Sequence, residues 1–206
     1  TITIGPSTTT TVNTGSNVKV TNLTINGDDT LNISDDTLTI RGTGAPFTKT
    51  GSFTITNSTV IYAGNDSTNV TTCQYNNLTF TPESGTPTYS LTGDLTGGNA
   101  LLGNLTISAD ATLSVGSGYA ISLAGTLTMN GGLITGASQN VSITANTVTM
   151  NSGSITTTSS GDITIYSTSS PSTFTLNTIT SAGNIDIGST TANTTPSSVT
   201  VNGVIT

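Results

Sequence analysis

The side chains that most often carry out catalysis or hold metal ions are scarce in this sequence. It contains no histidine, which excludes a Ser-His-Asp triad, a histidine metal ligand and an imidazole acid or base. The single cysteine, Cys73, excludes a CxxC pair and a zinc–cysteine cluster. Neither a phosphate-binding GxxxxGK motif nor a strand-linked GxGxxG is present, so nothing indicates a nucleotide site. We therefore expect no catalytic residue, no cofactor and no enzymatic activity.

Two Asp-Asp-Thr-Leu turns hold the one cluster of acidic side chains in the sequence, Asp28, Asp29, Asp35 and Asp36. Clustered carboxylates can ligate Ca²⁺, and paired carboxylates can cleave the glycosidic bonds of a polysaccharide. A sugar-cleaving site also uses aromatic and cationic groups, but the chain has no tryptophan. Aspartate in a turn that faces water is the more common arrangement. We therefore expect turn-forming aspartates, with weak calcium ligation as the alternative at these four positions.

Two kinds of covalent modification are compatible with the sequence. Cys73 is expected to be a small buried hydrophobic residue, with an intermolecular disulfide as the alternative in an exported protein. Asn-x-Ser/Thr sequons are candidate acceptors of N-linked glycans, although their number is close to what the composition gives by chance. The nine sequons begin at Asn22, Asn32, Asn57, Asn65, Asn69, Asn77, Asn104, Asn140 and Asn193.

The charge and composition limit the partners of the chain. Its net charge is −7, and Lys19, Arg41 and Lys49 are its basic residues. Without a basic patch, nucleic acid and anionic membrane surfaces are disfavoured as partners, and no apolar run is long enough to span a bilayer. The sequence holds 50 Thr and 26 Ser and opens on Thr1 rather than Met. Hydroxyl-rich, lysine-poor chains with a processed start are typical of extracellular and cell-surface proteins, which is where we expect this one.

The elements that would position any site are short strands in a repeat. Between residues 104 and 187, apolar doublets that alternate with polar residues return every 20 to 22 residues in three interleaved ladders. The first ladder is Leu105/Ile107, Leu127/Met129 and Val148/Met150. The second is Leu113/Val115, Leu133, Ile155 and Leu176. The third is Ile121/Leu123, Val141/Ile143, Ile163/Ile165 and Ile185/Ile187.

Three strands per repeat, each stacked on its counterpart in the next repeat, predict an all-β parallel β-solenoid. We expect about ten coils of 20–22 residues in one elongated domain over residues 1–206, because each coil buries its apolar face only against its neighbours. Proline and glycine loosen the pattern and predict a seam at residues 81–103. The alternative fold is a pilin-like β-sandwich, which short alternating strands also fit. The nine aromatic residues are few for such a sandwich core.

Several turn-plus-strand units share one form: Asn22-Leu-Thr-Ile, Asn77-Leu-Thr-Phe and Asn104-Leu-Thr-Ile, with the looser Asn146-Thr-Val-Thr-Met. In these units the chain resembles the parallel β-helix of autotransporter passengers and filamentous-haemagglutinin-like exoproteins, and the β-strand repeat proteins of prokaryotic envelopes. The resemblance covers most of the chain in style. It implies an exported surface protein with a right-handed solenoid and no particular activity.

Both ends of the sequence are strand-forming. The end strands of a solenoid present unpaired N–H and C=O groups, and neither a capping helix nor a charged repeat covers them here. We therefore expect a structural subunit of an extracellular filament, sheath or fibre, whose partner is another copy of itself. The alternative is a shaft or adhesive segment of a larger secreted adhesin, and a polysaccharide-acting enzyme ranks third. The expected assembly edges are Thr1, Ile2, Thr3, Ile4, Val199, Val201, Val204 and Ile205.

Overall fold

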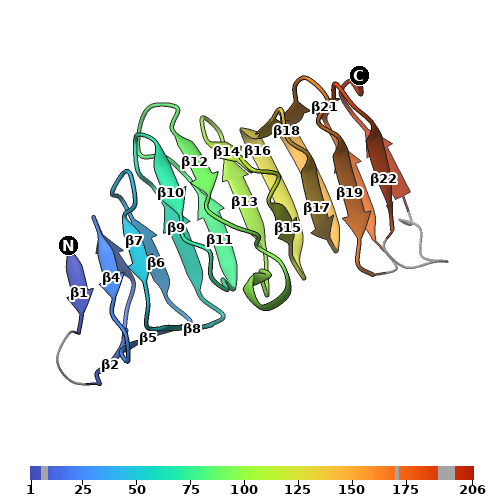
Figure 1. Cartoon of the computed structure of the whole chain (residues 1–206). Coiled ribbons are helices and arrows are strands. Elements are labelled where there is room, and N and C mark those ends of the chain that lie inside the picture. Colours follow the sequence, from blue (N-terminus) through green and yellow to red (C-terminus); the bar gives the residue numbers. More distant parts are fainter. Residues whose placement is uncertain (6–8, 170–171, 190–197) are drawn as a thin grey trace.

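Alternation of apolar and polar residues gives short strands in which every second side chain is buried. The computed structural model describes residues 1–5, 9–169, 172–189 and 198–206. Its strands pair in parallel, and about eight coils of about 22 residues stack along one axis (Figure 1). The predicted β-solenoid is confirmed. The expected ten coils were too many because some coils are long: paired residues Leu78 and Leu105 lie 27 positions apart, and Val148 and Phe174 lie 26 apart.

One ladder of strands runs the length of the stack, and we call it the spine. Its strands follow the order β3-β6-β9-β11-β13-β16-β18-β20-β23. Their apolar residues point inward and their threonines point outward, as in the burial pattern of Leu105–Ser108. The bounds are β3 Val18–Val20, β6 Thr37–Ile40, β9 Thr59–Tyr62, β11 Asn77–Phe80, β13 Leu105–Ser108, β16 Thr126–Ala137, β18 Thr147–Thr157, β20 Thr173–Leu176 and β23 Ser198–Val201.

Two further faces complete the later coils. The second face holds β10, β12, β14, the later halves of β16 and β18, and β21; the third holds β15, β17, β19 and β22. Their bounds are β10 Thr68–Val70, β12 Thr88–Leu91, β14 Thr112–Ser114, β21 Thr178–Thr180, β15 Ala120–Ser122, β17 Val141–Ala145, β19 Ile163–Ser167 and β22 Ile185–Ser189. Between β12 and β13 lies the one helical turn of the described residues, η1 at Gly97–Asn99.

The first three coils carry two sheets of their own beside the spine. One has the order β1-β4-β7 and the other β2-β5-β8, and both stop at the third coil. Their bounds are β1 Ile2–Ile4, β4 Leu23–Ile25, β7 Phe47–Lys49, β2 Thr11–Asn13, β5 Thr30–Ser34 and β8 Ser52–Thr56. The stack is therefore continuous along the spine and interrupted on its other faces.

Most of the predicted ladder residues stack as expected, but three assignments were wrong. The first ladder pairs as expected, Leu105 on Leu127 on Val148. In the second, Ile134 rather than Leu133 stacks on Leu113 and Ile155. Leu133 and Ile134 are consecutive apolar residues, so the sequence alone does not show which of them is stacked. The bend in β16 just before them places Ile134 in the core.

Leu176 was also misassigned, since it lies on the spine opposite Val201, and Ile179 takes its predicted place on Ile155. In the third ladder Ile121 pairs with Ile143 rather than with Val141. The fixed period of 20 to 22 fails at both points because corners differ in length.

The bends in β16 and β18 depend on glycine. Gly131 and Gly153 have positive φ angles of 114° and 89°, which favour a residue without a side chain. A Cβ atom on Gly153 would lie 2.2 Å from the carbonyl oxygen of Gly132 in the coil below. Because of these bends, β16 and β18 each continue from the spine into the second face without an intervening loop.

Candidate functional site

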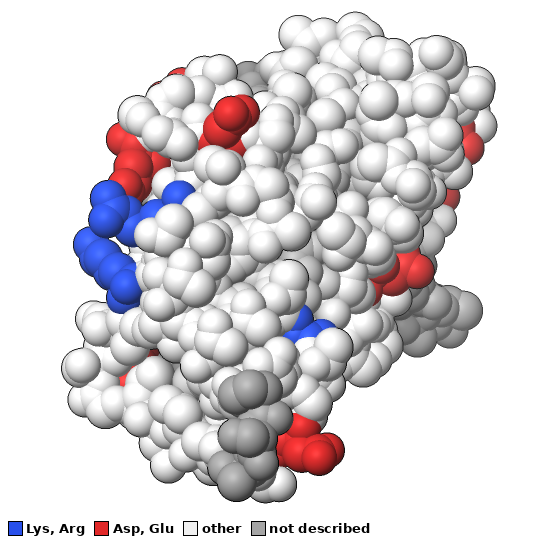
Figure 2. Space-filling model, turned by 60° about the vertical axis from the view of Figure 1, so that its left-hand side comes forward, with Lys and Arg blue, Asp and Glu red and all other residues white. Residues whose placement is uncertain are grey.

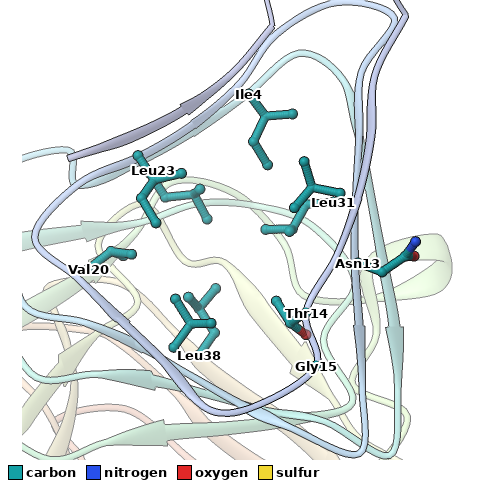
Figure 3. Close-up of a pocket in the computed structure, with 11 residues that line it drawn as sticks. Ile4, Asn13, Thr14, Gly15, Val20, Leu23, Leu31 and Leu38 are labelled. Carbon is teal, nitrogen blue, oxygen red and sulfur yellow. The ribbon is translucent and has the colours of Figure 1, made fainter.

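The N-terminal end of the stack exposes apolar core. β1, β2 and β3 each pair with one neighbour, so their outer edges are free. Ile2 and Val12 are 41% and 37% exposed, although the strand pattern points them toward the core, and Ile4 is buried at 4%. An apolar pocket of about 280 Å³ opens there, and Figure 3 shows it between Ile4, Val20, Leu23, Leu31 and Leu38. Thr1 and Thr3 lie exposed on the same edge.

The C-terminal end is similar. Val199 and Val201 stack on Phe174 and Leu176, but no strand of the described residues covers their other side and they are 47% and 44% exposed. Val204 and Ile205 are 57% and 39% exposed, and the Val204 carbonyl accepts a hydrogen bond from Ile179 N–H at 2.9 Å. Five of the eight predicted edge residues lie in β1 or β23, and Thr1, Val204 and Ile205 lie just outside these strands. Seven of the eight are exposed, and Ile4 is buried. Further parallel coils would cover these apolar groups at either end.

The acidic pairs are not brought together. Asp28 and Asp29 precede β5 and Asp35 and Asp36 follow it, so its five residues separate the pairs by roughly 16 Å. No group of three or more potential metal-ligating acidic or cysteine side chains exists among the described residues.

Each aspartate that the coils engage has a structural role. Asp29 is buried, and its Oδ1 accepts a hydrogen bond from Thr10 N–H at 2.9 Å. Asp36 Oδ2 accepts from Thr14 Oγ1 at 3.1 Å, one coil below. Asp35, at φ 59°, accepts from Asn57 Nδ2 at 3.1 Å. These bonds join adjacent coils and are the turn-forming role that the sequence indicated.

Asparagine and aspartate side chains at the coil corners form a set of contacts that the sequence reasoning missed. Asn77 Oδ1 accepts a hydrogen bond from Asn104 N–H at 2.9 Å, and Asn104 Oδ1 accepts from Thr126 N–H at 2.8 Å, one coil further on. Asn140 and Asp162 repeat the arrangement on another corner. The signal was present, since the Asn-Leu-Thr units mark these corners, but it was read only as turn preference.

The predicted sequons fall into three groups. Asn57, Asn65, Asn69, Asn104 and Asn140 are exposed. Asn22, Asn32 and Asn77 are partly buried, and Asn77 Nδ2 donates to the Ser58 carbonyl at 3.2 Å. Asn193 lies outside the described residues. A glycan therefore has room at the first group, whereas at Asn77, and also at Asn57, it would be attached to an Nδ2 atom that bonds to the adjacent coil.

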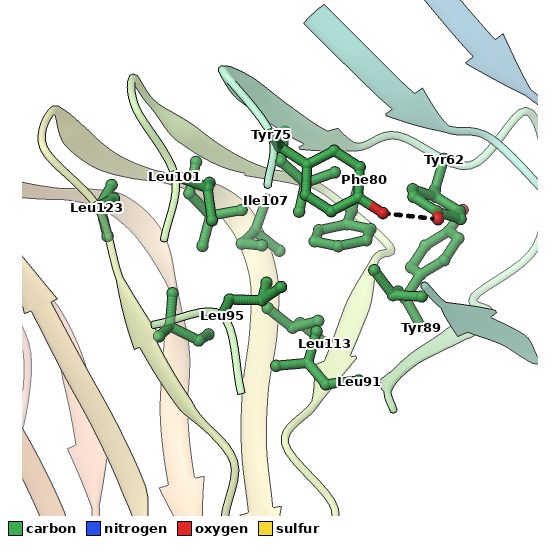
Figure 4. Close-up of a cluster of buried hydrophobic side chains, with 14 of the residues drawn as sticks. Tyr62, Tyr75, Phe80, Tyr89, Leu91, Leu95, Leu101, Ile107, Leu113 and Leu123 are labelled. Atoms are coloured by element: carbon green, nitrogen blue, oxygen red, sulfur yellow. Dashed lines mark hydrogen bonds between the residues drawn. The ribbon is translucent and has the colours of Figure 1, made fainter. Parts of the chain in front are cut away.

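Cys73 belongs to the buried core of the stack, in the fourth coil. Figure 4 shows two aromatic side chains of the same coil, Tyr62 and Tyr75. Cys73 is 4% exposed, and burial raises the pKa of its thiol to about 11. An intermolecular disulfide would require this coil to open, so the placement favours the small buried residue that we expected.

Two tyrosine hydroxyls close a hydrogen-bond chain in the same core. Thr71 N–H donates to Tyr62 Oη at 3.2 Å, the Tyr62 and Tyr75 hydroxyls lie 3.1 Å apart, and Tyr75 donates to the Thr71 carbonyl at 2.7 Å. Burial raises the pKa of Tyr62 to about 12 and that of Tyr75 well above its ordinary value. The chain satisfies polar groups inside an apolar core, which is a structural task.

The surface offers little charge. Figure 2 shows one face on which few side chains are charged and most of the surface is uncharged. Arg41 pairs with Glu83 at 2.5 Å, with both side chains substantially exposed, so solvent screens this ion pair and it contributes little to stability. Among the described residues, no helix has the length and hydrophobicity needed to cross a membrane.

Comparison with known proteins gave no match, since no family model, no curated protein and no solved structure is significantly similar to this chain. The two ends of the coil stack therefore remain the candidate functional site on geometry alone.

Proposed function

We propose that the chain is a structural element of an extracellular filament, sheath or fibre on a prokaryotic cell surface, which assembles by stacking coils end to end. The observation that carries the proposal is the pair of open ends. Each presents unpaired strand edges together with half-exposed apolar residues, Ile2 and Val12 at one and Val204 and Ile205 at the other.

Both ends lack a further coil that would pair with their strand edges and cover their apolar residues. Parallel strands added at either end would satisfy the free N–H and C=O groups. They would also cover the apolar pocket at the N-terminal end and the exposed valines and isoleucine at the C-terminal end. Covering a half-exposed valine or isoleucine gains on the order of 1 kcal/mol, so several together stabilise a contact. An end-to-end contact joins two different surfaces and does not close on itself, which gives a linear polymer.

The second candidate is a shaft segment of a larger secreted adhesin. The same open ends favour it, because further coils of one longer chain would cover them as well as a second copy would. In that case a chain of residues 1–206 alone forms single rods rather than fibres.

Complementary end variants test the proposal in residues 1–206, by negative-stain microscopy and light scattering. Ile2→Lys places a charge at one end and Val204→Lys at the other, both at exposed positions, so the fold is retained. We expect fibres from the unchanged chain, monomers from each variant alone, and dimers from an equimolar mixture because each variant keeps one intact end.

The matched control is Leu102→Lys. Leu102 is 51% exposed and apolar but lies away from both ends, so this variant is expected to form normal fibres. Fibres from both end variants would place the joint on a lateral surface and refute end-to-end stacking. Isolated rods from the unchanged chain would favour the adhesin shaft.

A further inference from the structure

A strand is missing from the stack beside β8. The fourth coil is the shortest on the spine, because Val60 pairs with Leu78 only 18 residues later, and the fifth is the longest, from Leu78 to Leu105. The sheet β2-β5-β8 stops at β8, and residues 73–76 of the fourth coil form no strand. Tyr75 and Asn76 already bond to the fifth coil through the amides of Leu102 and Gly103.

The backbone of β8 is therefore paired on one side only, with β5. Ser52 N–H donates to the Asp29 carbonyl at 2.8 Å, and the Thr56 carbonyl accepts from Asp35 N–H at 2.9 Å. Because successive residues of a strand direct their backbone groups to opposite sides, Phe53 and Ile55 direct theirs away from β5. Within the described part of the chain, these groups of Phe53 and Ile55 have no backbone partner.

A groove lies along this free edge. It has a volume of about 340 Å³ and separates β8 from the turn at Gly97–Asn99, which belongs to the fifth coil. Its lining is mainly polar and includes Thr54, Gln74 and Asn99. Lys49 also lines it, partly buried, and no acidic group of the described residues forms an ion pair with it.

We propose that this groove binds an extended peptide strand of a partner protein, added in parallel to β8, with a carboxylate side chain of the peptide near Lys49. A free strand edge binds peptides through main-chain hydrogen bonds, and its neighbouring side chains decide which peptide fits. The unpaired cation favours an acidic partner, because a complementary charge orients the strand and disfavours basic ones.

The β5 strand shows which register such a peptide takes. In the existing pair, Thr30 lies opposite Ser52, so the acidic residues before β5 lie opposite the corner that contains Lys49. A peptide in the same register on the free edge places its acids beside Lys49. The backbone N–H of the peptide residue opposite Thr54 then donates to the Phe53 carbonyl, and the backbone carbonyl of the same residue accepts from Ile55 N–H.

The probe is therefore the peptide of residues 28–34 with Leu31→Ala and Ile33→Ala, capped at both ends. The two alanines suit the core above β8, where Cys73 and Tyr75 already lie. Amide NMR of the full chain is the readout. In the free protein, the amides of Phe53 and Ile55 should exchange with solvent much faster than those of Ser52 and Thr54. Added peptide should shift and protect Phe53 and Ile55 in a saturable manner.

Three comparisons make the test specific. Replacing both peptide aspartates by asparagine should weaken binding about threefold, Lys49→Met should do the same, and the two changes together should cost no more than either alone. N-methylation of the peptide residue opposite Thr54 should abolish binding. Gly98→Trp should block the groove, whereas Gly27→Trp, at an exposed turn with equally open surroundings, should leave binding unchanged.

Several results would overturn the proposal. One is protection of the Phe53 and Ile55 amides in the free, dilute protein, and another is the absence of a saturable shift. Equal binding of the acidic and amide peptides would remove the role of Lys49. Protection that develops with protein concentration alone would show that a second copy of the chain occupies the groove in place of a partner peptide.

Discussion

Replacing Ile143 by alanine tests the packing of the solenoid core. Ile143 lies at the centre of β17, fully buried, with Ile121 paired on one side and Ile165 on the other. The three side chains form one column of the core, about 4.8 Å apart from strand to strand. The expectation from the sequence that Ile143 and Ile165 stack one coil apart is confirmed.

The size of the effect follows from the column. The substitution removes three carbon atoms, worth about 2.4 kcal/mol at about 0.8 kcal/mol each. The hole it leaves, roughly 70 Å³ if nothing moves, adds about 1.7 kcal/mol at the measured cost of cavities. Ile121 and Ile165 cannot collapse into it, because the backbone ladders hold them at the strand spacing. We therefore expect a loss of about 4 kcal/mol in the free energy of unfolding.

Urea unfolding followed by far-ultraviolet circular dichroism measures this loss, with Ser142→Ala as the matched control on the same strand. Ser142 is half-buried on the outward side and should change stability by about 0.5 kcal/mol or less. The slope with denaturant should be the same in both variants if the stack unfolds as one unit. Equal losses at the two positions would refute the assignment of inner and outer faces.

Three further predictions concern the corners and the aromatic cluster. Asn104→Ala should cost about 1 kcal/mol, because Thr126 N–H loses its partner in the coil below, whereas exposed Asn65→Ala should cost almost nothing in the same urea assay. Since the pKa of Tyr62 is raised from 10.0 to about 12, its neutral form contributes fully below pH 10 and the contribution is lost between about pH 10 and pH 12; Tyr62→Phe should flatten this part of the stability profile. Cys73 should react with a thiol reagent only at the rate of unfolding, and rapid reaction in the native protein would show that the fourth coil opens.

The sequence predicts the coil better than the corners. Alternation of apolar and polar residues identifies strands such as Leu105–Ser108, and their near-constant spacing identifies stacking. The register within a coil depends on the number of residues in each corner, and this number is not apparent from the sequence. Leu133 and Ile134 are equally apolar, and the bend after Gly131 selects Ile134 for the core. Composition and period therefore determine the fold, and backbone geometry determines which residue occupies each site.

The candidate sites show the same division. The edge residues at both ends follow directly from strand patterns at the ends of the sequence, apart from the burial of Ile4. The groove beside β8 does not, because it results from a short coil followed by a long one. The lengths of the coils can be counted in the sequence, but only the structure shows that residues 73–76 form no strand and that the backbone groups of Phe53 and Ile55 stay unpaired. The groove could not be predicted because no sequence pattern marks the place where a strand is absent.

Both proposals concern the free edge of a parallel strand, yet the chemistry of the two kinds of edge differs. At the ends, apolar core is exposed beside the edge, as at Val12 and Val204, so a single strand would leave most of it in water. A whole coil is needed there, and another solenoid supplies one. Beside β8 the core is already filled by Tyr75, and the groove is polar with Lys49 at its margin. A single strand is enough to complete that coil, because β8 lacks only backbone hydrogen bonds and its apolar side chains are already in contact with the core. The two kinds of edge should therefore bind independently, and a peptide that occupies the groove should leave the assembly of the ends unchanged.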